Sequence, residues 1–466
     1  MLKRKTLTKK ALFYTFISLY IFFYIISLNP SLLYFMGYNN PLYYQNHAPF
    51  FYTFSLMLFL VVYLIGFNEV SRINFSNKEI VLFLVLAMVL RVVSQVNEPM
   101  TTDLYRYLAN GLNWSNGKNA YIDPPFLVKG LSFIEYRSMY PPGAELLFFL
   151  MAKLWPSIHV YKCLAGFFEL AFLLLIYFQS LKKNRKYYFL FFLLNPVSIF
   201  EFHGEGHLDI IPIFFISLSI FTIYSPVGSF AIKKGKIVLA FILLSLGFLV
   251  KYQAALLWPF FVFQRVIKVR MKHLRDFILL FFQRFLIINW LVLFFIVVLV
   301  VLSSIPILFW QKDIALNSKI GSQMYFKYWV FQHPLTELLK WCNMSHVSAI
   351  KFSQISLLST TILGSLLYAL QRISFRQLYL FGAITFVLLF PVQHPWYSTI
   401  LYPAVFFNWP RLPKITVLGP VFISLNYISY SFNTSLGSYM GWFFFCALLY
   451  LNKNSLKKRD KYLLRN

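Results

Sequence analysis

Long apolar runs recur along almost the whole of this 466-residue chain. Hydrophobic residues make up 59% of the sequence and charged residues only 12%, which a soluble domain could not bury. A helix needs roughly 20 apolar residues to cross a bilayer, so the runs predict an all-α polytopic membrane protein with about 12 to 14 transmembrane helices. The runs lie at about 11–28, 50–67, 79–97, 160–179, 187–200, 208–225, 237–250, 252–266, 286–308, 353–370, 377–391, 396–410, 414–430 and 437–451.

The basic residues between these runs predict the orientation of the chain. Lys and Arg number 43 against 15 Asp and Glu, a net charge of +28. They gather in alternate loops, in the first ten residues and in the tail 453–466, whereas the loops between are almost free of them. The positive-inside rule therefore predicts an inner or plasma membrane protein with both termini in the cytoplasm. The excess of positive charge is topogenic, so no nucleic-acid partner is expected.

The chain is expected to form one domain, 1–466, with a retained signal anchor at its start. The basic loops all fall on the cytoplasmic side only if the segment at about 142–156 lies in the membrane interface or re-enters the membrane without crossing it. Two long segments, 98–141 and 309–352, then lie on the outer face and are expected to form amphipathic helices. The three cysteines are scattered, so neither a disulfide nor a zinc site is indicated.

The rare acidic residues gather in two of the outer segments. The segment 98–141 holds Glu98, Asp103, Asp123 and Glu135, and the turn 201–209 reads E-F-H-G-E-G-H-L-D. Carboxylates beside lipid are costly unless they have partners or a function, so a water-filled outward-facing cavity is expected. Outer turns at Lys251-Tyr252-Gln253, Gln332-His333-Pro334 and Gln393-His394-Pro395-Trp396-Tyr397 add cations and aromatic rings. Acids can accept a proton and cations can hold a phosphate, which suits group transfer from a phosphate-bearing lipid.

The stretch 101–121, T-T-D-L-Y-R-Y-L-A-N-G-L-N-W-S-N-G-K-N-A-Y, resembles the first outer loop of the GT-C membrane glycosyltransferases. The bacterial polyprenol-phosphate-mannose-dependent mannosyltransferases are the most similar, with D-x-x-R-Y-x-W-D-G followed by G-x-N-P-Y. Further matches follow in the same order: Tyr140-Pro141-Pro142, Asn195-Pro196, the turn Glu201 to Asp209, Lys251 after an apolar run, and His394 to Tyr397. Two positions depart from the pattern, because Asn110 stands where the family has its second acid and Ala120 where it has proline.

The resemblance implies a GT-C fold that takes a hexose, with mannose as the expected sugar, from a polyprenyl-phosphate carrier to a lipid or glycan acceptor. It implies that Asp103 is the catalytic base. Lys251, Arg106 and His394 are the candidates to hold the phosphate. The residues expected to bind substrate are Arg106, Tyr107, Asn110, Tyr121, Tyr140, Glu201, His203, His207, Asp209, Lys251, Gln253, His394, Trp396 and Tyr397.

Several of these residues also have purely structural interpretations. Asp103 and Arg106 have the spacing of an ion pair on a helix. Lys251 and Arg91 are placed to snorkel to the interface, with lipid phosphate as the alternative for Arg91. Trp396 and Tyr397 fit an aromatic belt as well as a sugar-stacking site. Glu169, inside an apolar run, is expected to have a structural partner.

Two further questions stay open at the level of sequence. The acids and histidines of 201–209 could hold a divalent metal, but their spacing of two is not helical, so hydrogen bonds to sugar hydroxyls or a local acid network are favoured and no cofactor is assigned. The rival functions are a flippase or transporter for a lipid-linked glycan, and an O-antigen-type polymerase or ligase. A transporter would place ionisable residues at mid-membrane, whereas here they gather at one face.

Overall fold

The computed structural model describes about three fifths of the chain, and all of its described secondary structure is helical apart from one bridge residue. The described residues are 14–15, 17–22, 24–25, 54–55, 57–59, 77–96, 99, 101–131, 134, 136–181, 186–224, 234–257, 333–370, 372–392, 394–407, 412–427 and 436–452. The predictions for the first ten residues, Glu98, Glu135, Gln332, Gln393, the range 309–332 and the tail 453–466 lie outside these residues.

The principal helices follow the apolar runs. The α-helices are α4 (Asn77–Val96), α5 (Asp103–Ser115), α6 (Pro142–Leu154), α7 (Ile158–Leu181), α8 (Lys186–Leu193), α9 (Pro196–Ile199), α10 (Ile210–Tyr224), α11 (Lys234–Val250), α16 (Pro334–Trp341), α17 (His346–Ala369), α18 (Phe375–Leu389), α19 (Leu412–Ile423) and α21 (Leu436–Leu451). Three 3-10 helices, η2 (Tyr252–Leu257), η5 (Pro395–Phe406) and η6 (Ser424–Asn426), and the π-helical turn η1 (Phe200–Gly204) complete the described elements.

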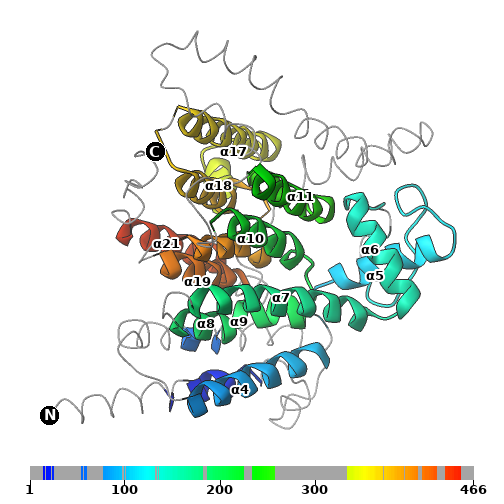
Figure 1. The fold of residues 1–466 in the computed structure, drawn as a ribbon. Coiled ribbons are helices and arrows are strands. Elements are labelled where there is room, and N and C mark those ends of the chain that lie inside the picture. The colour runs from blue at the N-terminus through cyan, green and yellow to red at the C-terminus, as the bar shows by residue number, and fades with distance from the viewer. Residues whose placement is uncertain are drawn as a thin grey trace.

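Helix α10 lies at the centre of the described bundle, where it packs against α7, α11 and η5 (Figure 1). Helix α4 runs along one side, beneath α7 and α8, and α17 packs on α18 at the opposite side (Figure 1). Helices α5 and α6 pack against each other at one end of the bundle (Figure 1). The short helices α5 and α6 therefore close one end of the longer apolar helices.

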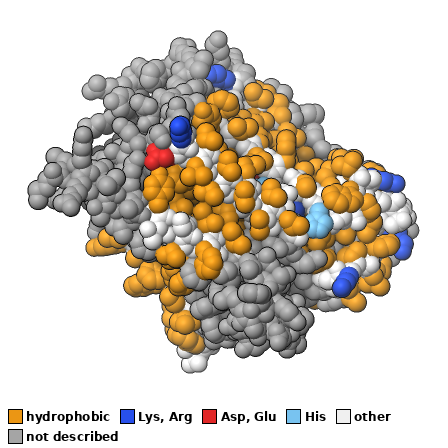
Figure 2. All heavy atoms as spheres, turned by 90° about the horizontal axis from the view of Figure 1, so that it is seen from below, with side chains coloured by type: hydrophobic (Ala, Val, Ile, Leu, Met, Phe, Trp, Pro, Cys, Tyr) orange, Lys and Arg blue, Asp and Glu red, His pale blue; other side chains and the backbone are white. Residues whose placement is uncertain are grey.

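Three described helices are long and apolar enough to cross a membrane: Lys78–Val96 of α4, Ile158–Phe178 of α7 and all of α17. Five further apolar helices of the described part (α10, α11, α18, α19 and α21) are shorter than a full crossing. Hydrophobic residues of α4 face outward: the exposed fraction is 54% for Val85 and 61% for Val92. In Figure 2, the described part of the face seen from below Figure 1 is largely hydrophobic, with most of its Lys and Arg side chains toward the edges. Such a surface supports membrane association.

The segment 98–141 contains the amphipathic helix that was expected there. Leu104, Tyr107, Leu108 and Gly111 recur at helical spacing and form the buried face of α5. Helix α6 begins directly after Tyr140-Pro141, and its 13 residues are too few to cross a bilayer. The expectation that the segment at 142–156 does not cross fully agrees with this length.

Among the described residues, proline interrupts the regular α-helix in two of the predicted apolar runs. The run 187–200 breaks after Leu193, and a new helix begins at Pro196, where the Asn195 side chain accepts from the backbone N–H of Val197 at 3.0 Å. Proline has no N–H to donate to the preceding turn, so it begins helices more readily than it continues them. The run 396–410 is a 3-10 helix over Pro395–Phe406, with Pro403 inside it.

Candidate active site at the start of helix α5

Asp103 is the first residue of α5, at the end of the bundle. Its side chain is 32% exposed, more than that of the other carboxylates that surround it. The positive end of the helix dipole favours its ionised form. Burial raises the pKa of Asp103, but the nearby His207, Lys251 and His394 outweigh burial and hold the pKa at about 2. Asp103 is therefore a carboxylate that stays ionised and remains accessible.

His207 lies between Asp103 and a second carboxylate. Its Nδ1 is 3.5 Å from Oδ2 of Asp103, and its Nε2 is 3.6 Å from Oε2 of Glu201. His207 and Glu201 are both fully buried. The hydroxyl of Tyr427 donates to Glu201 at 3.1 Å, from the far end of the chain. Burial raises the pKa of Glu201, and the neighbouring Glu205 adds to this effect.

A chain of three stacked rings fixes the orientation of His207. The Trp396 ring lies 3.7 Å from the His207 ring at 22°, and 4.2 Å from the His394 ring at 4°. Trp396 is only 3% exposed. Imidazole rings thus stack on the indole and bury it, so Trp396 is not an aromatic-belt residue, and in this arrangement it is not open to stack on a sugar.

Lys251 forms the cationic part of the site. Its Nζ contacts Oδ2 of the buried Asp209, whose Oδ1 accepts from Gln253 at 2.7 Å. The same Nζ lies 6.0 Å from the centre of the Tyr140 ring and 5.7 Å from that of Tyr397, within cation–π range. Lys251 is therefore held inside the protein and is not a snorkelling lysine. These contacts bring Lys251 together with Asp209 and Tyr397, whereas His333 lies elsewhere, with its Nε2 3.0 Å from the carbonyl of Leu388.

The predicted residues of α5 and its loop serve mostly to shape the site. Tyr107 stacks on Phe148 at 4.8 Å and meets Tyr140 edge-on at 5.4 Å. Arg106 donates to the carbonyl of Tyr136 at 2.9 Å, and the Tyr121 hydroxyl donates to the carbonyl of Tyr140 at 2.8 Å. These contacts tie the loop after α5 to the start of α6. Whether any of these residues binds substrate stays a prediction.

A buried carboxylate that the sequence analysis missed lies directly behind α5. Glu145 of α6 accepts from Asn110 at 2.9 Å, from Trp114 at 2.7 Å and from the hydroxyl of Ser138. Burial raises the pKa of Glu145 to about 7, against the lowering effect of these three donors. Asn110 thus acts as a donor to Glu145. The rarity of acidic residues was the one signal that could have pointed to Glu145.

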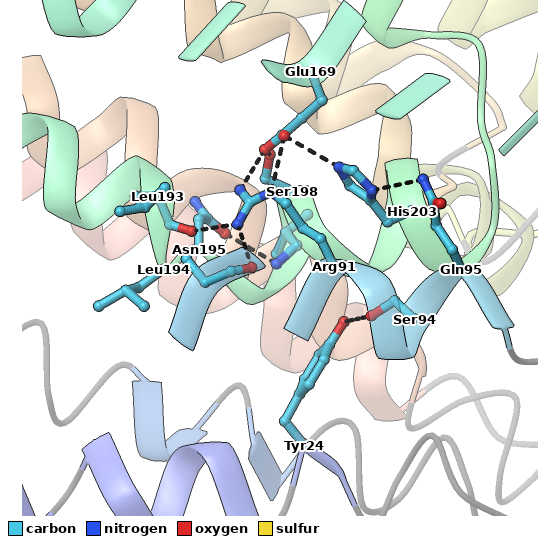
Figure 3. Close-up of polar contacts among 12 residues, drawn as sticks. Tyr24, Arg91, Ser94, Gln95, Glu169, Leu193, Leu194, Asn195, Ser198 and His203 are labelled. Atoms are coloured by element: carbon cyan, nitrogen blue, oxygen red, sulfur yellow. Dashed lines mark hydrogen bonds and ion pairs between the residues drawn. The ribbon is translucent and has the colours of Figure 1, made fainter. Parts of the chain in front are cut away.

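His203 of the turn 201–209 belongs to a different polar cluster (Figure 3). Glu169 accepts from Arg91 at 3.0 and 2.7 Å, from Ser198 at 2.7 Å and faces His203 at 3.2 Å. Arg91 is 1% exposed and also donates to the carbonyls of Ala87 and Leu193. The expected structural partner of Glu169 is confirmed, whereas both surface interpretations of Arg91, lipid phosphate and snorkelling, are wrong. The structure places His203 with Glu169 instead of with Asp103.

The described residues contain no group of three or more His, Cys, Asp or Glu side chains arranged to hold a metal ion. The acids and histidines of 201–209 are divided instead between the two clusters. Glu205 accepts from the backbone N–H of Thr101 at 2.7 Å, which fastens the chain just before α5 to this turn. The observed geometry is that of a hydrogen-bonded acid network.

Comparisons with protein-family models, with curated proteins and with solved structures found no match.

Proposed function

We propose that this chain is a GT-C-like glycosyltransferase. It would transfer a hexose, with mannose as the expected sugar, from a polyprenyl-phosphate carrier to a lipid or glycan acceptor at the outer face of the membrane. The observation that carries the proposal is the juxtaposition of an accessible ionised carboxylate, Asp103, with the enclosed cation Lys251. The proposal includes the GT-C fold, about 12 to 14 crossings with cytoplasmic termini, and residence in the inner or plasma membrane.

Asp103 is the base in this proposal. As the acceptor oxygen attacks the anomeric carbon, Asp103 takes the proton of that hydroxyl. The bond from the anomeric carbon to the phosphate oxygen breaks, and the polyprenyl phosphate leaves with the electron pair. A pKa of about 2 keeps Asp103 ionised before the reaction, and the hydroxyl becomes acidic only as the new bond forms. A positioned base of this kind contributes roughly 10² to 10⁴-fold in rate.

Lys251 is the group best placed to stabilise the leaving phosphate. Its ammonium is already paired with the buried Asp209, so a phosphate would share the cation with that carboxylate. Charge that is fixed in place before the reaction needs little reorganisation as the leaving group becomes anionic. Burial lowers the pKa of His394 to about 3, so His394 would contribute a neutral ring and not a second cation.

The surroundings of the site suit a lipid-borne donor. Helices α5 and α6 close the end of a bundle whose long helices α4 and α17 expose large apolar side chains (Figure 1). A polyprenyl chain dissolves in the bilayer beside such helices, and its phosphate lies at the membrane surface. Glu169 lies inside the candidate span of α7, but its carboxylate already accepts hydrogen bonds from Arg91 and Ser198. An acidic residue that is engaged in this way argues against a free transport site.

The test is sugar transfer by the purified full chain in lipid vesicles, with a panel of radiolabelled polyprenyl-phosphate hexoses and total membrane glycolipid as acceptor. Asp103→Asn should lose roughly 10² to 10⁴-fold of the turnover. The matched control is Asp123→Asn, because Asp123 lies in the same outer segment and only accepts from a loop N–H at 2.6 Å. Near wild-type turnover in Asp103→Asn would exclude Asp103 as the base. No transfer from any donor by the folded wild type would favour a flippase, polymerase or ligase.

A further inference from the structure

The environment of His207 is unusual for a fully buried histidine. Both of its ring nitrogens lack a hydrogen-bond partner among the described residues, yet each faces a carboxylate oxygen, at 3.5 Å for Asp103 and 3.6 Å for Glu201. Unpaired buried nitrogens are costly, so a native structure rarely keeps them without a function. Catalytic hydrogen bonds are often long in the absence of substrate and shorten when the reacting groups are in place.

The ring of His207 is held so that it cannot turn away from these two oxygens. Trp396 covers one face of the imidazole, and His394 stacks on Trp396. The preceding Gly206 has a φ of +65°, and a Cβ there would lie 2.6 Å from Leu104 of α5. The turn thus brings His207 against the start of α5 by a close approach that only glycine permits.

The two carboxylates differ in a way that selects one tautomer of the ring. Asp103 is partly exposed and stays ionised, whereas Glu201 is fully buried and its pKa is raised. The raised pKa favours the protonated form of Glu201, in which the carboxyl faces Nε2 as a donor, so the ring proton belongs on Nδ1, where it faces the Asp103 carboxylate. A second residue that fixes the tautomer in this way is a recurring feature of active sites.

Building on the proposed function, we propose that His207 is the positioning residue of the catalytic base, with its Nδ1–H aimed at Asp103 and its tautomer set by Glu201. The site would thus work as a line of three groups, Asp103, His207 and Glu201. Two sets of groups face this line. Around Asp103 they are His207, Lys251, His394 and Tyr107, and around Glu201 they are His207, Tyr24, Tyr402, Tyr427, Glu205 and Asp209.

The proposal predicts that loss of His207 changes the titration of Asp103. The interaction with His207 lowers the pKa of this carboxyl, whereas burial raises it. In His207→Gln the midpoint should therefore rise, by about 1 to 3 pH units. A histidine that only fills space would leave the midpoint where it is.

The experiment follows the protonated carboxyl band of Asp103 by infrared difference spectroscopy on the full chain in lipid, and assigns it by comparison with Asp103→Asn. It needs no substrate. The band should appear at higher pH in His207→Gln than in the wild type. The matched control is His159→Gln, because the His159 ring lies on α7, 3.2 Å from the carbonyl of Gln95. An unchanged midpoint in His207→Gln would overturn the proposal.

Glu201 provides a second pair of variants in case His207→Gln does not fold. Glu201→Gln keeps an N–H that can donate to Nε2, so the midpoint of Asp103 should stay low. Glu201→Leu removes that donor, so the midpoint should rise. Equal midpoints in the two variants would overturn the role of Glu201 in setting the tautomer.

The pH profile of sugar transfer separates this proposal from the proposed function. If transfer is observed, His207→Gln should acquire an acid limb that the wild type lacks, beyond any uniform loss of rate. An unchanged profile shape would contradict the positioning role while leaving the glycosyltransferase intact. If no donor supports transfer, the proposed function fails, and the infrared midpoint still decides whether His207 controls Asp103.

Discussion

Arg91 of α4 and Glu169 of α7 form a two-point ion pair in the interior of the bundle, with N–O distances of 3.0 and 2.7 Å (Figure 3). The two residues are 78 positions apart in the chain. Each is at most 1% exposed, and the remaining Arg91 nitrogen donates to Ala87 and Leu193. The pair therefore joins two of the candidate spans to the broken helix α8–α9.

Removal of one partner should destabilise the protein strongly. In Arg91→Leu the carboxylate of Glu169 would stay buried without its cation, which costs about 3 to 5 kcal/mol. The free energy of unfolding can be measured by SDS titration in mixed micelles. The double variant Arg91→Leu, Glu169→Leu should be less destabilised than Arg91→Leu, because it buries no unpaired charge. A double variant as unstable as the sum of the two single ones would contradict the pairing.

The turn that carries His207 should not accept a side chain at Gly206. Gly206→Ala would need φ near +65° and would place its Cβ 2.6 Å from Leu104, so a loss of about 1 to 3 kcal/mol in stability is expected. Gly204→Ala is the matched control, because its Cβ would meet Phe200 at an ordinary 3.5 Å. Thermal unfolding in detergent compares the two, and equal melting temperatures would show that the turn adapts.

Glu145 should make stability depend on pH near neutrality. Burial raises its pKa from 4.5 to about 7 in the folded protein. Between these values the folded state binds more protons than the unfolded state, so stability falls as pH rises through this window. The fall is at most about 3 kcal/mol and ends above about pH 7.

Glu145→Gln should lack this pH dependence, because the amide does not titrate. The check is the difference in unfolding free energy between about pH 5 and pH 8, measured for both proteins under the same conditions. A wild type and variant with parallel pH curves would show that Glu145 titrates normally. The Ser138 hydroxyl donates to Oε1 of the ionised carboxylate, and a hydroxyl can turn to accept a hydrogen bond from the protonated carboxyl.

Lys251→Gln should weaken binding of the free polyprenyl phosphate product by at least about tenfold, because a charged contact to phosphate is lost. Product inhibition of sugar transfer, or direct binding of radiolabelled polyprenyl phosphate to vesicles, gives the affinity. Lys153→Gln is the control, because Lys153 is an exposed lysine at the end of α6. Equal loss of affinity in both variants would indicate general attraction to the membrane surface and not a phosphate site.

Trp396→Leu should lower sugar transfer more than Trp396→Phe does. The phenyl ring can still stack between His207 and His394, whereas leucine cannot hold the imidazole ring by stacking. Turnover of the two variants at one pH, with melting temperature as the check on folding, distinguishes them. Similar turnover in both would show that the stack does not position His207.

Features that depend on a local pattern could be predicted from the sequence. The apolar runs predicted α4, α7 and α17 as membrane helices, and the segment that contains α5 was expected to form an amphipathic helix. The gathering of acids, histidines and Lys251 at one end was also predicted, because charges beside lipid need partners. The run 187–200 was predicted to be continuous, although Pro196 begins a new helix inside it.

The packing of the helices determines which polar groups meet. Tyr427 donates to Glu201 across 226 positions, and Glu145 collects donors from α5 and from the loop before α6. His203 and His207 stand four positions apart, yet one turns to Glu169 and the other to Asp103. A buried polar side chain takes the partner that neighbouring helices bring to it, and helix packing brings together residues that are remote in the chain. These partners therefore cannot be predicted from a local sequence pattern.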